Sequence, residues 1–282
     1  MKWNKFLIKI IQTSLKEDIG RGDITSKVTI PKSKFAEGII LSKSDGILCG
    51  VEVAKNVFKL LDNKINIEIY LKDGSIIKSG DIIAKVYGSA RSILSAERTA
   101  LNFMQRLSGI SSLTNLFLSK IKHTKAKILD TRKTAPCLRY FDKYAVKIGG
   151  GSNHRFGLFD MFLIKDNHIA VSGSITNAVL SCKNYMKKFN KKFLIEVETK
   201  NIDEVKESLL NKVDIIMLDN FSLDEIKKAV DLIDGKCKIE VSGGITLENV
   251  RRIAETGVDF ISVGALTHSV KALDISLDIR MS

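Results

Sequence analysis

The fold is decided by a repeat in residues 193–264, which read FLIEVETKNIDEVKESLLNKVDIIMLDNFSLDEIKKAVDLIDGKCKIEVSGGITLENVRRIAETGVDFISVG. Short runs rich in β-branched residues end in polar or glycine-containing sequence, and a stretch with helical spacing of apolar residues follows each of them. The polar endings recur almost evenly, because Glu198 to Asp219 is 21 residues, Asp219 to Ser242 is 23 and Ser242 to Gly264 is 22. A repeating strand–helix unit predicts a parallel sheet, most simply a (β/α) barrel.

The second half of the chain contains six strand candidates of this kind. They are residues 127–130, 161–165, 193–198, 214–218, 238–241 and 259–263. Six strands are fewer than the eight of a closed barrel, so the predicted fold class is α/β with an incomplete (β/α) barrel over residues 111–269.

The first part of the chain has a different pattern, which predicts an N-terminal α+β domain over residues 1–110. An amphipathic helix is expected to open the chain within residues 1–11, and a long helix over residues 92–107 is expected to stop at Gly109 as its C′ residue. The tail, residues 270–282, is a candidate to pack back on this domain. The other expected elements are a helix over residues 51–62 and strands over residues 37–48, 65–71 and 76–86.

Composition narrows the functional class. Of 282 residues, 44% are apolar, and 45 Lys+Arg against 32 Asp+Glu give a net charge of +13. The apolar content excludes a disordered chain, and no apolar run approaches the roughly 20 residues of a membrane span. Four widely spaced cysteines without a C-x-x-C pair indicate a reducing, cytoplasmic setting. The positive charge leaves nucleic acid, anionic lipid or a strongly anionic small substrate as ligands.

Charged and glycine-rich sequence follows the predicted strands, at the barrel end where active sites lie. The glycines suit a phosphate, because they let backbone N–H groups approach an anion. The acids Glu198 and Asp219 could meet sugar hydroxyls or Mg²⁺. The sequences concerned are Thr131-Arg132-Lys133, Lys165-Asp166, Glu198, Asp219, Ser242-Gly243-Gly244 and Gly264-Ala265.

Basic residues are dense between residues 131 and 168. A mixture of arginine and lysine suits a ligand with several anionic groups. The glycines at 149–151 indicate a close backbone approach near His154 and Arg155. The basic residues are Arg132, Lys133, Arg139, Lys143, Lys147, His154, Arg155, Lys165 and His168.

Several motifs, in order from about residue 14 to 270, closely resemble the quinolinate phosphoribosyltransferase family, also called nicotinate-nucleotide pyrophosphorylase (carboxylating). They are SLKEDIGRGDIT (14–25), ERTALNFMQRLSGI (97–110), DTRKTAPCLRYFDKYAVKIGGGSNHRFGLFD (130–160), FLIKDNH (162–168) and IEVSGGIT (239–246). Two positions depart from the family pattern, since Cys137 replaces a usual glycine and Asp142 a usual glutamate.

The resemblance implies phosphoribosyl transfer from phosphoribosyl pyrophosphate to quinolinate with decarboxylation, giving nicotinate mononucleotide, pyrophosphate and CO₂ in NAD biosynthesis. It also implies Mg²⁺ and a homodimer or larger oligomer in which Arg98 is donated to quinolinate across the interface. The implied quinolinate and pyrophosphate pocket is Thr131, Arg132, Lys133, His154, Arg155 and Lys165; the ribose and Mg²⁺ acids are Glu198 and Asp219; the 5′-phosphate loops are Ser242, Gly243, Gly244, Gly264 and Ala265. Lys133, Lys165, Glu198 and Asp219 are the expected catalytic residues.

Three other interpretations stay open at this point. One is a two-domain paralogue associated with molybdate transport, and another is an aldolase that forms a Schiff base on Lys165. The third is a non-catalytic protein that binds nucleic acid through its positive charge.

Overall fold

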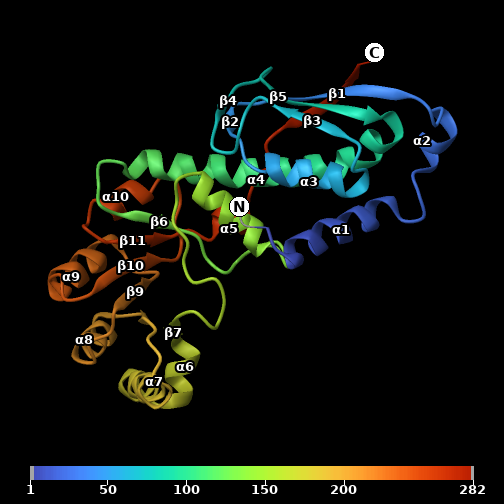
Figure 1. Cartoon of the computed structure of the whole chain (residues 1–282). Helices are drawn as coiled ribbons and strands as arrows, with labels where there is room; N and C mark the ends of the chain where they lie inside the picture. The colour runs from blue at the N-terminus through green and yellow to red at the C-terminus, as the bar shows by residue number, and fades with distance from the viewer. Residues whose placement is uncertain (1–2, 281–282) are drawn as a thin grey trace. The chain divides into compact units, whose positions relative to one another are not determined.

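The computed structural model describes residues 3–280, which form two compact units (Figure 1). Within that range the first unit takes in residues 3–115, 135–150 and 269–280. The second unit takes in residues 116–134 and 151–268.

An antiparallel sheet with helices against it forms the first unit. The strand order is β12-β1-β5-β3, and β2 pairs separately with β4. The apolar side chains of Val53, Val57 and Phe58 on α3 are buried, as expected for the inner face of an amphipathic helix. The elements are α1 (Lys5–Ile19), α2 (Ile24–Thr29), β1 (Phe35–Ser42), β2 (Gly46–Ile47), α3 (Val51–Leu61), β3 (Asn66–Ile69), β4 (Ile76–Ile77), β5 (Ile82–Ser89), α4 (Ala90–Ile121), α5 (Arg139–Ile148) and β12 (Ile275–Arg280).

Strand β12 comes from the C-terminal tail. It pairs antiparallel with β1 from Glu37 opposite Arg280 to Ser42 opposite Ile275. Residues 281–282 of the tail, and residues 1–2 of the expected first helix, lie outside the described residues.

Helix α4 corrects the prediction that a helix stops at Gly109, because it continues without a break to Ile121. A Cβ atom at Gly109 would lie only 2.2 Å from the backbone oxygen of Lys271. The glycine is therefore needed where the returning chain touches the helix, and it does not mark the helix end.

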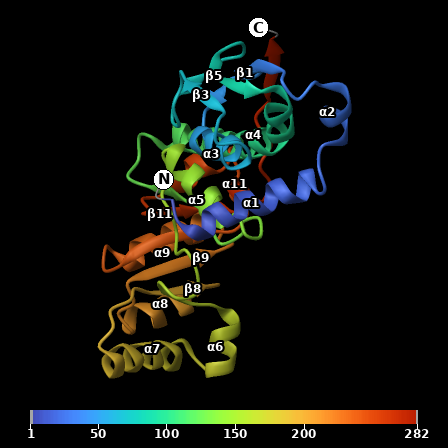
Figure 2. The same ribbon diagram turned by 45° about the vertical axis from the view of Figure 1, so that its right-hand side comes forward.

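The second unit is built on a six-stranded parallel sheet with the order β6-β11-β10-β9-β8-β7. Figure 2 shows α7, α8 and α9 along one side of β8 and β9. The two end strands, β6 and β7, are not joined, so the predicted incomplete barrel is confirmed. The elements are β6 (Lys127–Leu129), β7 (Phe162–Ile164), α6 (Asp166–Ser172), α7 (Ile175–Phe189), β8 (Ile195–Thr199), α8 (Ile202–Leu210), β9 (Ile215–Asp219), α9 (Leu223–Ile233), β10 (Lys238–Ser242), α10 (Val250–Ala254), β11 (Phe260–Ser262) and α11 (Ala265–His268).

Local sequence explains why strands and helices alternate here. Every residue of β8 is buried, as is usual for a parallel strand covered on both faces. The helices that follow begin at side-chain caps: Asn201 accepts the Glu204 N–H in α8, and Ser222 forms a capping box with Glu225 in α9. Among the described residues, no helix combines the length and apolar character that a membrane crossing requires.

Candidate functional site

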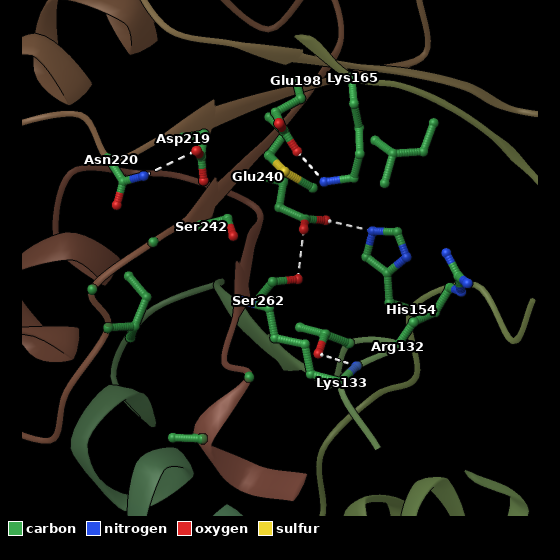
Figure 3. A pocket seen from close by; sticks show the side chains of 18 of the residues that line it. Arg132, Lys133, His154, Lys165, Glu198, Asp219, Asn220, Glu240, Ser242 and Ser262 are labelled. Atoms are coloured by element: carbon green, nitrogen blue, oxygen red, sulfur yellow. Dashed lines mark hydrogen bonds and ion pairs between the residues drawn. The ribbon is translucent and has the colours of Figure 1, made fainter. Parts of the chain in front are cut away.

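The carboxyl ends of the parallel strands surround a pocket of about 780 Å³ (Figure 3). The strand register aligns these ends, since Ser242 pairs with Asp219 in the sheet. All lining residues belong to the second unit. They are Thr131, Arg132, Lys133, His154, Arg155, Leu163, Lys165, Glu198, Met217, Asp219, Asn220, Glu240, Ser242, Gly243, Gly244, Ile245, Thr246, Ser262, Gly264, Ala265 and His268.

Every site residue that the family resemblance implies lines this pocket except Arg98, whereas Asp166 and His168, at the start of α6, do not line it. Arg98 is exposed on α4, in the first unit. The structure therefore brings together residues from the ends of six different strands, and Arg98 is not among the residues that line the pocket.

The middle of the basic cluster does not line the pocket. Arg139, Lys143 and Lys147 lie on α5, which is part of the first unit. The close backbone approach expected at glycines 149–151 is present, but the segment that approaches is α4. A Cβ atom at Gly149 would lie 2.4 Å from the Ser111 backbone oxygen. Cys137 has a φ of 63°, which explains why glycine suits its position.

An ion pair crosses the pocket wall between neighbouring strand ends. The Lys165 ammonium group bonds to the Glu198 carboxylate, as Figure 3 shows. The Lys165 side chain is 44% exposed, whereas that of Glu198 is 9% exposed. Next to them, Asn220 donates its side-chain N–H to Asp219 at 2.9 Å. Two carboxylates and an ammonium group therefore border one part of the pocket.

The loop after β10 contains two glycines with backbone conformations that residues with a side chain rarely adopt. Gly243 has a φ of 92°, and a Cβ atom there would lie 2.1 Å from Oδ1 of Asn220. Gly244 also has a positive φ, of 59°. The Asn249 side chain stabilises the loop through two hydrogen bonds: it donates to the Gly244 oxygen at 2.8 Å and accepts the Thr246 N–H at 2.8 Å. Such a loop can present backbone N–H groups to an anion.

The loop after β6 is joined to α11, the short helix that follows β11. Thr131 accepts the Lys133 N–H at 3.0 Å, and Thr267 donates its hydroxyl to the Lys133 oxygen at 2.7 Å. A Cβ atom at Gly264 would lie 3.1 Å from Cδ of Lys133. Lys133 is thus placed over the second glycine-containing strand end.

Positive charge is concentrated around Arg155. Burial, and then the charge of Arg132, lower the pKa of the Arg155 guanidinium. Its Nη1 donates to the Met161 oxygen at 3.3 Å, and its buried Nε has no hydrogen-bond partner among residues 3–280. A bound anion would relieve both the charge repulsion and the unpaired donor.

Asp130, which the sequence analysis did not single out, fixes the segment that carries His154 and Arg155. It is fully buried, accepts the His154 backbone N–H at 2.9 Å and bonds to the Asn153 amide. Its signal in the sequence is its place directly before Thr131, at the end of a predicted strand.

Two buried acids lie beside the His154 ring. Its Nε2 is 3.1 Å from Glu196 and 3.4 Å from Glu240, and Ser262 donates its hydroxyl to Glu240 at 2.5 Å. Burial lowers the pKa of His154, the two neighbouring carboxylates raise it, and the Arg155 N–H that donates to Nδ1 opposes a second proton on the ring. Burial, and then the negative charge of Glu240, raise the pKa of Glu196.

Glu240 and Ser262 were also missed by the sequence analysis. Side chains alternate along a strand, so Glu240 shares a face with Ser242, and Ser262 shares one with Gly264. This parity is the signal that could have found them.

The fold and the site together define a class: an α/β protein with an incomplete barrel and a pocket lined by basic, acidic and glycine residues at the carboxyl ends of its strands. Two family models match the chain, the N-terminal domain of quinolinate phosphoribosyl transferase over residues 23–108 and its C-terminal domain over residues 110–278. The chain belongs to the quinolinate phosphoribosyltransferase family.

Similar proteins cover nearly the whole chain. The chloroplastic nicotinate-nucleotide pyrophosphorylase [carboxylating] of Arabidopsis thaliana is 48% identical over 96% of this chain and 82% of the plant protein. A probable nicotinate-nucleotide pyrophosphorylase [carboxylating] of Bacillus subtilis is 44% identical over 98% of this chain and 94% of its own length. The solved nicotinate-nucleotide pyrophosphorylase of Francisella tularensis has a TM-score of 0.94 and 42% identity, covering 99% of this chain and 98% of that one.

Proposed function

We propose that this chain transfers the phosphoribosyl group of phosphoribosyl pyrophosphate to quinolinate and releases pyrophosphate and CO₂. The product is nicotinate mononucleotide, a precursor of NAD. The observation that carries the proposal is the pocket itself, where cations, two strand-end acids and two glycine-containing loops border one space of about 780 Å³ in a member of this family.

The cationic side of the pocket suits quinolinate, which has two carboxylates. Arg132 and Arg155 line this side of the pocket. Guanidinium groups bind carboxylates in a fixed, two-point geometry, so they would also orient the pyridine nitrogen for attack.

The glycine loops suit the 5′-phosphate of the second substrate. Gly243 and Gly244 bring the backbone close to the pocket, and Gly264 does the same beneath Lys133. Lys133 and Lys165 are then the cations that neutralise the leaving pyrophosphate.

Glu198 and Asp219 are the acids placed to stabilise positive charge that develops on the ribose ring. Both are carboxylates at the pocket surface, a donor type that suits Mg²⁺, so they would hold this ion together with water or substrate oxygens. When bound, Mg²⁺ would supply further neutralisation of the pyrophosphate.

Loss of CO₂ needs little help from the protein, because the positive charge of the quaternised pyridine nitrogen stabilises the electron pair that the broken C–C bond leaves on the adjacent ring carbon. This carbon then takes up a proton from water. We expect no covalent bond between enzyme and substrate. The Schiff-base alternative is disfavoured because the ion pair to Glu198 engages the Lys165 nitrogen that would have to attack a carbonyl group.

The oligomer and the compartment are part of the proposal. Arg98 is exposed, and the family resemblance assigns it to quinolinate, so a second copy of the chain would donate it in a homodimer or larger assembly. The four cysteines are unpaired thiols, in keeping with the reducing cytoplasm.

Release of labelled CO₂ from quinolinate in the presence of phosphoribosyl pyrophosphate tests the function. Asp219→Asn should lower kcat at least about 100-fold, with a smaller change in KM, because the lost charge acts mainly in the transition state. Asp214→Asn is the matched control, since Asp214 directly precedes the same strand at its opposite end and accepts the Ile195 N–H.

No CO₂ release by the native chain would refute the proposed reaction. An effect of Asp219→Asn on KM alone would show that this acid only binds substrate.

A further inference from the structure

A line of polar contacts, one hydrogen bond and one ion pair, runs from β11 through β10 to the loop before β7, at the inner side of the pocket (Figure 3). The Ser262 hydroxyl donates to Oε1 of Glu240 at 2.5 Å, and Oε2 of Glu240 lies 3.4 Å from Nε2 of His154. At the other side of the ring, Nδ1 of His154 accepts the Arg155 backbone N–H at 2.7 Å. The side chain of Glu240 is 1% exposed and that of His154 is 7% exposed.

The contact with Arg155 decides which ring nitrogen carries the proton. A backbone N–H can only donate, so Nδ1 of His154 must offer a lone pair to it. The proton of the neutral ring is then on Nε2, where it faces the acceptor oxygens of Glu240 and Glu196.

Two other states of the ring conflict with this geometry. A positively charged ring, which the two acids favour, would carry a hydrogen on Nδ1, and that hydrogen would meet the Arg155 N–H across 2.7 Å. A metal ion held by His154, Glu196 and Glu240, whose ligand atoms lie within 4.8 Å of one another, would need a bare Nε2. The Arg155 contact therefore opposes both states.

We infer that Glu240, supported by Ser262, is a positioning residue that holds His154 as its Nε2–H tautomer and thereby fixes the wall of the pocket next to Arg155. The inference rests on the proposed function, because it assigns this wall to quinolinate. Both ring nitrogens contact protein groups, so His154 would face the substrate with its ring carbon atoms. Its role in binding is then to shape the pocket wall and not to form a hydrogen bond with the substrate.

Nitrogen NMR on the native protein tests the tautomer directly. The chain has only four histidines, so labelling with ¹⁵N-histidine gives few signals, and His154→Asn identifies those of His154. At pH 7 we expect a protonated Nε2 and an unprotonated Nδ1, unchanged by added Zn²⁺. A proton on Nδ1, a doubly protonated ring, or a Zn²⁺-dependent change at Nε2 would overturn the inference.

Kinetics test the effect on the pocket. Glu240→Ala should raise the KM for quinolinate about tenfold and change kcat and the KM for phosphoribosyl pyrophosphate less than about threefold, as expected for the loss of one buried polar contact to His154. Glu240→Gln keeps an oxygen acceptor and should restore most of the quinolinate affinity. Glu255→Ala is the control, because it removes an exposed acid paired with His123.

Equal rises in both KM values, or no rescue by glutamine, would show a merely structural role for Glu240. If the native chain releases no CO₂, the proposed function fails, whereas the tautomer measurement still decides the state of His154.

Discussion

At the scale of single residues, the pocket depends on glycines for different physical reasons. Gly243 combines a φ of 92° with a Cβ position 2.1 Å from Asn220, whereas Gly235 has a φ of 70° and open space around its Cβ position. A residue with a side chain loses about 1–2 kcal/mol of stability when it adopts a positive φ. If its Cβ atom also clashes with a neighbouring residue, that neighbour must move as well. Gly243 therefore links the glycine loop to the carboxylate that Asn220 contacts.

Gly243→Ala should raise the KM for phosphoribosyl pyrophosphate at least about tenfold, because the loop and Asn220 must both shift. Steady-state kinetics with each substrate varied in turn would measure it. Gly235→Ala is matched in backbone conformation and should cost about 1–2 kcal/mol of stability with unchanged kinetics. Equal kinetic effects of both variants would mean that the clash with Asn220 is unimportant.

At the scale of elements, α4 shows how a tertiary contact changes the meaning of a sequence signal. Glycine is a common residue just after a helix, so Gly109 predicted an end. In the fold, α4 runs from Ala90 to Ile121, and Gly109 meets the backbone of Lys271 shortly before β12. The tail could not pass the helix at this distance if residue 109 had a side chain.

Gly109→Ala separates these two effects. Alanine would favour the helix by about 1 kcal/mol, but we expect a net loss of about 1–3 kcal/mol in the free energy of unfolding, because the added methyl group overlaps the Lys271 oxygen. Urea unfolding followed by circular dichroism would measure it. Ser119→Ala, at an exposed position of the same helix, should leave stability unchanged or raise it. A stabilised Gly109→Ala protein would contradict the close approach.

At the scale of the whole molecule, the residues proposed for the site are divided unequally between the two units. Arg98 belongs to the first unit, while the pocket is lined entirely from the second. Closed symmetric dimers contain two identical sites, so an arginine donated by each copy to the other would complete both of them.

Mixing two inactive variants tests this exchange. Arg98→Ala and Lys165→Ala should each be inactive alone, yet equal mixtures that exchange subunits should regain up to about a quarter of native activity, since half of the dimers are mixed and each has one intact site. CO₂ release after co-refolding measures the recovery, and native protein treated in the same way is the control. No recovery in demonstrated heterodimers would place Arg98 and Lys165 in the same copy.

The local sequence was sufficient to predict the barrel strands and most of the pocket. The interval between Glu198, Asp219 and Ser242 predicts successive strand ends, and parallel strands place their ends at one edge of the sheet. Both signals are local, because strand alternation and helix caps depend on neighbours in the chain. The incomplete barrel and the set of residues around its mouth followed from them.

Only the tertiary structure decided the partners that come from distant segments. The sequence does not show that Ser262, Glu240 and His154 form one line of contacts, that Gly149 touches α4, or that α5 belongs to the first unit. The physical reason is that a buried polar or glycine residue is selected by what packs against it, and that partner is fixed only when the whole chain has folded.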